Sequence, residues 1–265
     1  AAGGDGTIHR IDRHPTMSRH PVTPMAEADL RRHLAAQGLA DIGLVDYRAY
    51  AGGSVARAAL PGGSAAALFD VAAEADLAAI GELLATSSEN GSILAVGASS
   101  VARAFAAGHG KAVVAAPAAD ATPRETGPVL ALVGSLSPVT RAQVEAAQGY
   151  AMLSVDAGRL LANAGFAAEL RSAALSRLAR GDVMLVTEKP EGAPTDSGAV
   201  AEATGGLLAA IIAEARLGRL VVAGGDTSTM AVRSLPLWGL SYRGPCVPGA
   251  PLCRAHSDDE RLDGL

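Results

Sequence analysis

The sequence predicts an α/β protein with two α/β domains, largely parallel sheets and a cleft between the domains. Short apolar runs alternate with Ala-rich amphipathic stretches along its 265 residues, a pattern typical of parallel sheets covered by helices. Three of the runs end in glycine, with a hydroxyl or acidic residue within the next two positions. A stretch rich in proline and small residues at 115–128 divides the chain, and we place the domains at residues 1–118 and 119–265.

The expected strands are runs of four to seven residues rich in Val, Leu and Ile, of the type that is buried on both faces of a sheet. In chain order they are IGLVDY (42–47), AAALFDV (65–71), SILAVG (92–97), PVLALVG (128–134), MLSV (152–155), DVMLVT (182–187) and LVVAGG (220–225).

Helices are expected in the amphipathic stretches between these runs. Thr23 suits the cap of the first helix, Pro24 its first position and Gly38 its end. In chain order the expected helices are 26–37, 74–85, 99–107, 138–148, 157–163, 167–180, 198–217 and 228–235.

The composition narrows the class of protein. The chain is 49% hydrophobic but only 3% aromatic, and its net charge is −5. It has no Lys/Arg cluster interleaved with aromatic residues, so nucleic acid and anionic membranes are poor candidates as partners. The longest apolar segment, 205–215, is too short to cross a bilayer. Cys246 and Cys253 lack the companions of a zinc set, so we expect free thiols and no metal bound by clustered ligands.

The junction RLVVAGGDTST at 219–229 is the most informative motif. A buried strand that breaks into two glycines lets backbone N–H groups approach an anion closely, which predicts a phosphate-binding turn. An alternative stays open on the local sequence. Asp226, Thr227 and Ser228 also suit an N-cap of the helix expected at 228–235, and such a capped turn need bind nothing.

Two further strings repeat the order strand, glycine, hydroxyl, helix. One is GSLSP at 134–138, where Ser135 and Ser137 lead into a helix, and the other is GASS at 97–100. An anion at such a helix start gains from the N–H groups and the helix dipole. The GxxxxGK[ST] and GxGxxG motifs are absent, which argues against a Walker-type site and a Rossmann oxidoreductase.

Two other segments allow two interpretations each. Pro15 and Pro21 hold their preceding residues extended, so Arg13, His14, Arg19 and His20 either bind an anion or are solvated basic groups on a stiff segment. The irregular loop at 188–198 is either a lid or an ordinary surface loop.

Six strings in this order resemble the four-carbon acid sugar kinase family: HPVTPMAEADLRRHLAAQ, FDVAAEADLAAIG, LAVGASSVARAF, LVGSLSPVTRAQVEAA, VVAGGDTS and VPGAPLCR. The resemblance runs nearly end to end. It implies a cytoplasmic bacterial enzyme that transfers the γ-phosphoryl group of ATP to the terminal hydroxyl of a tetronate such as threonate, erythronate or 3-oxo-tetronate. Members have also been labelled type III effector or Hrp-dependent proteins.

The resemblance implies a substrate-binding domain followed by a nucleotide-binding domain, and it assigns residues to each. ATP contacts fall to Ser135, Gly224, Gly225, Asp226, Thr227 and Ser228. Substrate contacts fall to Gly97, Ser99 and Ser100, with His20 as a hypothesis. Asp226 is the expected catalytic residue, because its carboxylate suits magnesium held through water beside phosphate oxygens.

Two departures from the family pattern bear on activity. The Asp-Asp-Leu-Thr-Gly-Ala motif that helps hold the substrate and a later Lys-Ser-Gly segment are both absent. We therefore expect either a fragment of a longer kinase or a shortened relative. The alternative function is a non-catalytic nucleotide- or sugar-acid-binding module. The identity of the four-carbon acid, the catalytic base and the oligomeric state stay open.

Overall fold

The computed structural model describes residues 7, 9–19, 23–50, 63–88, 91–110, 126–135, 137–188, 196–247 and 250–265. They form two compact units, one built from 9–18 and 24–110 and the other mainly from 126–265. The predicted domain boundary between 118 and 119 lies outside the described residues, as does most of the loop predicted at 188–198. The cleft between domains stays a prediction.

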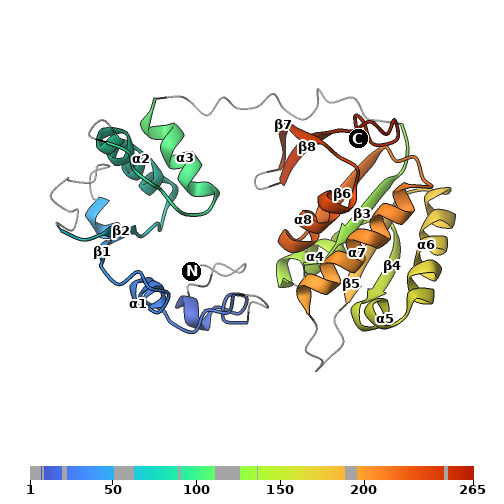
Figure 1. Cartoon of the computed structure of the whole chain (residues 1–265), viewed down its shortest axis with the longest axis horizontal. Coiled ribbons are helices and arrows are strands. Elements are labelled where there is room, and N and C mark those ends of the chain that lie inside the picture. Colours follow the sequence, from blue (N-terminus) through green and yellow to red (C-terminus); the bar gives the residue numbers. More distant parts are fainter. Residues whose placement is uncertain are drawn as a thin grey trace. The chain divides into compact units, whose positions relative to one another are not determined.

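The first unit contains a parallel pair of strands, β1 (Ile42–Val45) and β2 (Ala66–Phe69), with Val45 opposite Phe69. Its helices are α1 (Leu30–Ala35), α2 (Glu74–Ser88) and α3 (Ser99–Gly108), with short 3-10 turns at Ile11–Arg13 and Tyr47–Tyr50 (Figure 1). A small core holds Val45, Tyr50, Leu77, Ala79, Ile80 and Ala104.

The start of α1 differs from the prediction. The helix begins at Leu30 and is capped by Asp29, whose carboxylate accepts the Arg31 N–H at 3.0 Å. The Asp29 N–H is itself bonded to Glu27 Oε1 at 2.9 Å. Because Asp29 offers a local cap in this way, the helix starts there and not after Thr23. Gly38, at φ +98°, follows the helix end as predicted.

Two glycines let α2 and α3 approach each other closely. A Cβ built at Gly81 would overlap the carbonyl of Ala104, and one built at Gly108 would overlap the carbonyl of Gly81. Backbone-to-backbone contact of this kind leaves no room for a side chain. It fixes α3, and with it the hydroxyls at its start, against α2.

The strand predicted at 92–97 is wrong. Residues 92–96 form no strand, and in the described part of this unit β1 pairs only with β2. Leu94 is 88% exposed and Val96 is 85% exposed. An apolar run forms a stable strand only where a neighbour supplies hydrogen bonds and buries its side chains, and the described residues supply neither.

The second unit is built on a four-stranded parallel sheet. Its strands are β3 (Val129–Val133), β4 (Ala151–Asp156), β5 (Val183–Glu188) and β6 (Arg219–Ala223), in the order β4-β5-β3-β6 (Figure 1). Leu130 of the central strand β3 lies opposite Val183 on one side and Leu220 on the other. The four predicted strands of this block are confirmed.

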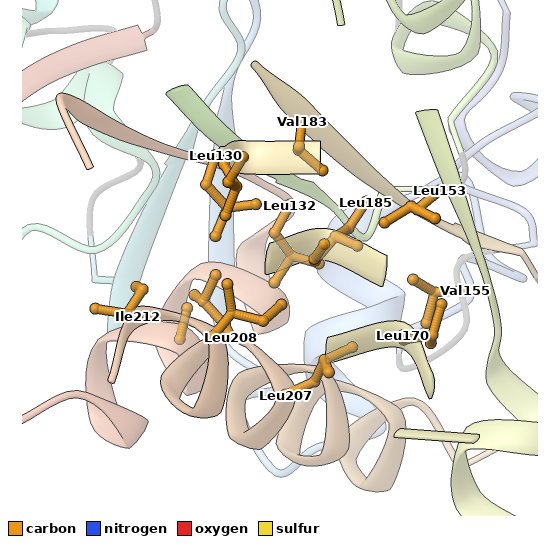
Figure 2. Close-up of a cluster of buried hydrophobic side chains, with 14 of the residues drawn as sticks. Leu130, Leu132, Leu153, Val155, Leu170, Val183, Leu185, Leu207, Leu208 and Ile212 are labelled. Atoms are coloured by element: carbon orange, nitrogen blue, oxygen red, sulfur yellow. The ribbon is translucent and has the colours of Figure 1, made fainter. Parts of the chain in front are cut away.

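Helices cover both faces of this sheet. On one face lie α5 (Ala157–Ala162), α6 (Ala164–Leu178), α7 (Ser197–Ile212) and α8 (Gly225–Ser234). Figure 2 shows Leu207, Leu208 and Ile212 of α7 packed beneath Leu130 and Leu132 of the sheet. Val144 of α4 (Pro138–Ala146) packs with the cluster on the other face. Burial on both faces explains the continuous apolar runs of the central strands β3 and β5.

An antiparallel hairpin completes the unit, and no strand was predicted there. It consists of β7 (Gly239–Val247) and β8 (Ala250–His256), with irregular register between Tyr242 and Gly244. Pro and Gly within the run hide the strand pattern in the sequence, because both residues are depleted from strands. Cys246 and Cys253, one on each strand, are free thiols as expected.

Candidate functional site

The carboxyl ends of β3 and β6 are neighbours, since the two strands are parallel and Val133 lies opposite Ala223. The chain leaves them toward opposite faces of the sheet. β3 leads into α4, whose Val144 packs on one face, and β6 leads into α8, whose Ala231 packs on the other. Open α/β sheets bind ligands where neighbouring connections diverge in this way, so these two turns form the candidate site.

The second of these turns places an uncapped helix start at the site. Gly224, at φ 130° and ψ 136°, is the N-cap of α8, and no side chain caps the helix. The Ser228 N–H donates to the Gly224 carbonyl at 2.8 Å, which closes the first turn. The N–H groups of Gly225, Asp226 and Thr227 therefore begin the helix without intrahelical acceptors.

The alternative in which Asp226, Thr227 and Ser228 cap a helix at 228–235 is thus wrong. All three lie inside the first turn of α8, which begins at Gly225. The physical reason is the backbone of Gly224. Its positive φ is open to glycine and lets the strand pass directly into the helix.

The two turns are in direct contact. The N–H groups of Gly134 and Ser135 both donate to the Ala223 carbonyl, at 2.8 and 3.2 Å. A Cβ at Gly134 would overlap the Thr227 hydroxyl, and one at Gly224 would lie 3.2 Å from the Ser135 nitrogen. The Thr227 side chain is buried against the facing turn. Thr227 therefore holds the two turns together, and its N–H is the group left for a ligand.

Ser135 belongs to a cluster of three hydroxyls at the start of α4. The Thr140 hydroxyl donates to Ser135 Oγ at 2.9 Å, and the Ser137 hydroxyl lies 2.9 Å from Thr140 Oγ1. Ser137 is also the N-cap of α4 and accepts the Thr140 N–H at 3.1 Å. The sequence motif predicted Ser135, but it gave no sign that Thr140 contacts it.

Asp226 is exposed in the first turn of α8. A carboxylate in that position is favoured by the helix dipole, and its exposure leaves the oxygens open to a cation. Ser228 is half-buried, one residue further along the helix. The structure thus brings together the six predicted ATP-contacting residues at one edge of the sheet, namely Ser135, Gly224, Gly225, Asp226, Thr227 and Ser228.

The predicted substrate contacts lie in the first unit. Gly97 precedes α3, and Ser99 and Ser100 are its first two residues. The N-cap of α3 is Ala98, which makes no side-chain cap, so this helix start is also open. The structure brings these three residues together. His20 lies outside the described residues.

The sequence reasoning missed two carboxylates at the carboxyl edge of the β1–β2 pair. Asp46 follows β1 and Asp70 follows β2, although both had been placed inside predicted strands. Hydrogen bonds and an ion pair with Arg48 lower the pKa of Asp46 to about 2. Burial and the nearby Asp46 charge raise the pKa of Asp70 above its ordinary value. Their position after adjacent strands was the available signal.

The hydroxyl of Tyr50 connects the two ends of these strands. It donates to the Asp70 carbonyl at 2.7 Å and lies 3.5 Å from the Val45 carbonyl. Burial, followed by the charge of Asp70, raises the pKa of Tyr50 to about 12. Tyr50 therefore stays protonated and acts here as a hydrogen-bond donor.

No group of three or more His, Cys, Asp or Glu side chains among the described residues is arranged to hold a metal ion. No helix within the described ranges has the length and apolarity needed to span a membrane.

Two family models match the chain. The model described as a nucleotide-binding C-terminal domain matches residues 130–263, which include both turns of the candidate site. The model described as a sugar-binding N-terminal domain matches residues 5–105, which include the start of α3.

Similar curated proteins are named as kinases. A 3-oxo-isoapionate kinase of Paraburkholderia graminis is 38% identical over 100% of this chain and 62% of its own length. A 3-oxo-tetronate kinase of Methylobacterium radiotolerans is 34% identical over 92% of this chain and 60% of its own. The chain thus spans about 60% of the length of these relatives.

Solved structures share the fold. A Haemophilus influenzae protein of the DUF1537 family aligns with 90% of this chain and 60% of its own, at a TM-score of 0.54 and 23% identity. A Salmonella typhimurium protein described as a putative tRNA synthase aligns with 94% and 64%, at a TM-score of 0.57 and 24% identity. The matches to both domain models and to the kinase relatives show that the chain belongs to the four-carbon acid sugar kinase family.

Proposed function

We propose that this chain belongs to an ATP-dependent kinase that phosphorylates the terminal 4-hydroxyl of a four-carbon acid sugar such as threonate, erythronate or 3-oxo-tetronate. The kinase names of the relatives support this class of reaction. The single observation that carries the proposal is the uncapped start of α8 facing the Ser135 turn. We also propose a cytoplasmic location, where ATP is available.

Phosphoryl transfer asks the protein mainly to hold donor and acceptor in line and to neutralise charge on the transferring oxygens. The N–H groups of Gly225, Asp226 and Thr227 are oriented donors for polyphosphate oxygens at the positive end of a helix dipole. Because glycines bring both turns together without side chains, phosphates can approach the backbone there. Ser135 adds a hydroxyl from the neighbouring turn.

Magnesium suits the donor set of this turn. The ion is bound in kinases by one or two carboxylates together with phosphate oxygens and water, and Asp226 offers one exposed carboxylate beside the helix start. When bound, magnesium supplies charge neutralisation on the phosphates. Asp226 would hold it through water, while the backbone N–H groups hold the phosphate oxygens.

The acceptor sugar acid would bind at the start of α3. Its carboxylate is an anion, and the open N–H groups there, with the hydroxyls of Ser99 and Ser100, are donors suited to it. The second candidate function is binding of nucleotide or sugar acid without catalysis. The observation that favours this second function is that the chain spans only about 60% of the length of the kinase relatives.

One assay separates the two functions. Formation of ADP from ATP would be measured with the 265-residue chain in the presence of threonate, erythronate, 3-oxo-tetronate or 3-oxo-isoapionate, with no acceptor as control. ADP formation that depends on one of these acids is the expected result. If calorimetry detects ATP binding but no phosphoryl group is transferred to any of these acids, the chain binds nucleotide without catalysis.

A further inference from the structure

The hydroxyls of Ser135, Ser137 and Thr140 form a hydrogen-bonded chain with a direction. The Thr140 hydroxyl donates to Ser135 Oγ at 2.9 Å. A hydroxyl has one hydrogen to donate, so the 2.9 Å contact between Ser137 Oγ and Thr140 Oγ1 must be a donation from Ser137. Ser137 Oγ in turn accepts the Thr140 N–H at 3.1 Å. The hydroxyl of Ser137 therefore donates to Thr140, and the hydroxyl of Thr140 donates to Ser135.

This direction decides what Ser135 can do. Its oxygen accepts from the Thr140 hydroxyl and, at 3.4 Å, from the Ser137 N–H. Both lone pairs are then in use, and the hydroxyl hydrogen of Ser135 is the remaining group. Ser135 is therefore set to donate, and a hydroxyl that already accepts hydrogen bonds is a stronger donor.

Ser135 lies where such a donor would meet an anion. Its own N–H donates to the Ala223 carbonyl at 3.2 Å, at the end of β6. The Cβ direction of Gly224, the N-cap of α8, points to within 3.2 Å of the Ser135 nitrogen. Ser135, at the end of the hydroxyl series, thus lies beside Gly224, where α8 begins.

We propose that Thr140 is a positioning residue for the nucleotide, because its hydroxyl, oriented by Ser137, sets Ser135 as a donor to a phosphate oxygen. This inference rests on the proposed function, since it requires polyphosphate to bind at the start of α8. Thr140 acts only through Ser135 and does not touch the ligand. If Thr140 only stabilised the fold, its substitution would weaken the binding of every ligand equally.

The test measures binding by calorimetry with the full chain, using ATP, pyrophosphate and adenosine as three probes. Thr140→Val keeps the shape of the side chain and removes its hydroxyl. We expect Thr140→Val to weaken ATP and pyrophosphate binding about 5- to 10-fold, the size of effect expected for the loss of one neutral hydrogen bond. Adenosine binding should be unchanged, and Thr140→Ser should restore the phosphate affinities.

Ser135→Ala supplies the second side of a double-mutant cycle. In the Ser135→Ala background, Thr140→Val should change the ATP affinity by less than about 2-fold, since the donor that it orients is gone. Thr204→Val is the matched control. Its hydroxyl donates to the Val200 carbonyl within α7 at 2.9 Å, so the same substitution there should leave all three affinities unchanged.

Three results would overturn the inference. They are an equal loss of adenosine affinity in Thr140→Val, a full further loss in the Ser135→Ala background, and wild-type protein that binds neither ATP nor pyrophosphate. The proposed kinase function fails by a different result. If the coupling between Thr140 and Ser135 holds but no acid in the ADP assay accepts phosphate, the positioning role stands and the kinase reaction does not.

Discussion

At the scale of single residues, Asp226 is the side chain on which the proposed chemistry depends most. It is exposed in the first turn of α8, next to the N–H groups proposed to hold polyphosphate. Its carboxylate would repel phosphate unless a cation lies between them. The position therefore makes sense for a group that holds magnesium and has little value for binding phosphate by itself.

Asp226→Ala should reduce acid-dependent ADP formation on the order of 10²-fold, a loss typical for removal of one electrostatic stabiliser of a transition state. Stability should change little, because the side chain is exposed. Asp258→Ala, another exposed carboxylate of the same unit, is the matched control and should retain full turnover. Unchanged turnover in Asp226→Ala would remove the role proposed for this residue.

Asp70 makes the stability of the first unit depend on pH. Burial and Asp46 raise its pKa in the folded state, so its contribution to stability is present below the unfolded pKa, near 3.8, and is lost as pH rises through the folded value. Asp70→Asn should therefore raise the melting temperature of the first unit at pH 7, and this gain should shrink as pH falls toward 4.

Asp259 offers a control of the opposite sign for that measurement. Hydrogen bonds from Arg261 lower its pKa to about 2, so its stabilising contribution is present above pH 3.8 and is lost as pH falls through 2. Asp259→Asn should lower stability at neutral pH. If Asp70→Asn gave the same gain at every pH, the raised pKa of Asp70 would not be its cause.

At the scale of elements, the β3–α4 and β6–α8 turns are in close contact because Gly134 lies directly against the Thr227 side chain. Gly134→Ala should destabilise the second unit by ~1–3 kcal/mol, the usual result of forcing atoms into a packed interior. The new Cβ would overlap the buried Thr227 side chain. Urea unfolding measures the loss.

The same experiment has an internal check. Adding Thr227→Ala to Gly134→Ala removes the hydroxyl and methyl groups that the new Cβ meets and leaves only the Cβ of residue 227, at 2.8 Å, so part of the lost stability should return. Gly206→Ala on α7 is the control, since nothing lies within 4 Å of its Cβ position; it should be neutral or stabilising. Equal effects of Gly134→Ala and Gly206→Ala would contradict the close approach.

The elements of the second unit could largely be predicted from sequence, because the central strands β3 and β5 are buried on both faces and read as unbroken apolar runs. Two failures have physical causes. The run at 92–97 has the composition of a strand, but strand formation depends on a neighbour that composition does not reveal. The β7–β8 hairpin contains Pro245 and Gly244, which obscure its alternation.

The candidate site could be predicted only in part. Glycines between strand and helix pointed to Ser135 and to Gly224 and Gly225, because that order of residues has a local structural meaning. The contact of Gly134 with Thr227 joins turns that are about ninety residues apart, and only the parallel pairing of β3 with β6 brings them together. The Ser135–Thr140 bond required side-chain geometry.

At the scale of the whole molecule, the chain combines two compact units that match a sugar-binding and a nucleotide-binding domain. Each has a helix start without a side-chain cap, α3 in the first and α8 in the second. Anion binding at both fits a reaction between an acid sugar and ATP. The central claim is that polyphosphate binds at the second of these helix starts.

Amide NMR of the full chain during titration with ATP and magnesium tests that claim most directly. The account predicts the largest shifts at the N–H groups of Gly225, Asp226 and Thr227 and at Ser135, with pyrophosphate moving the same signals. ATP binding with shifts concentrated elsewhere, for example around the β7–β8 hairpin, and unchanged signals at the start of α8 would contradict it.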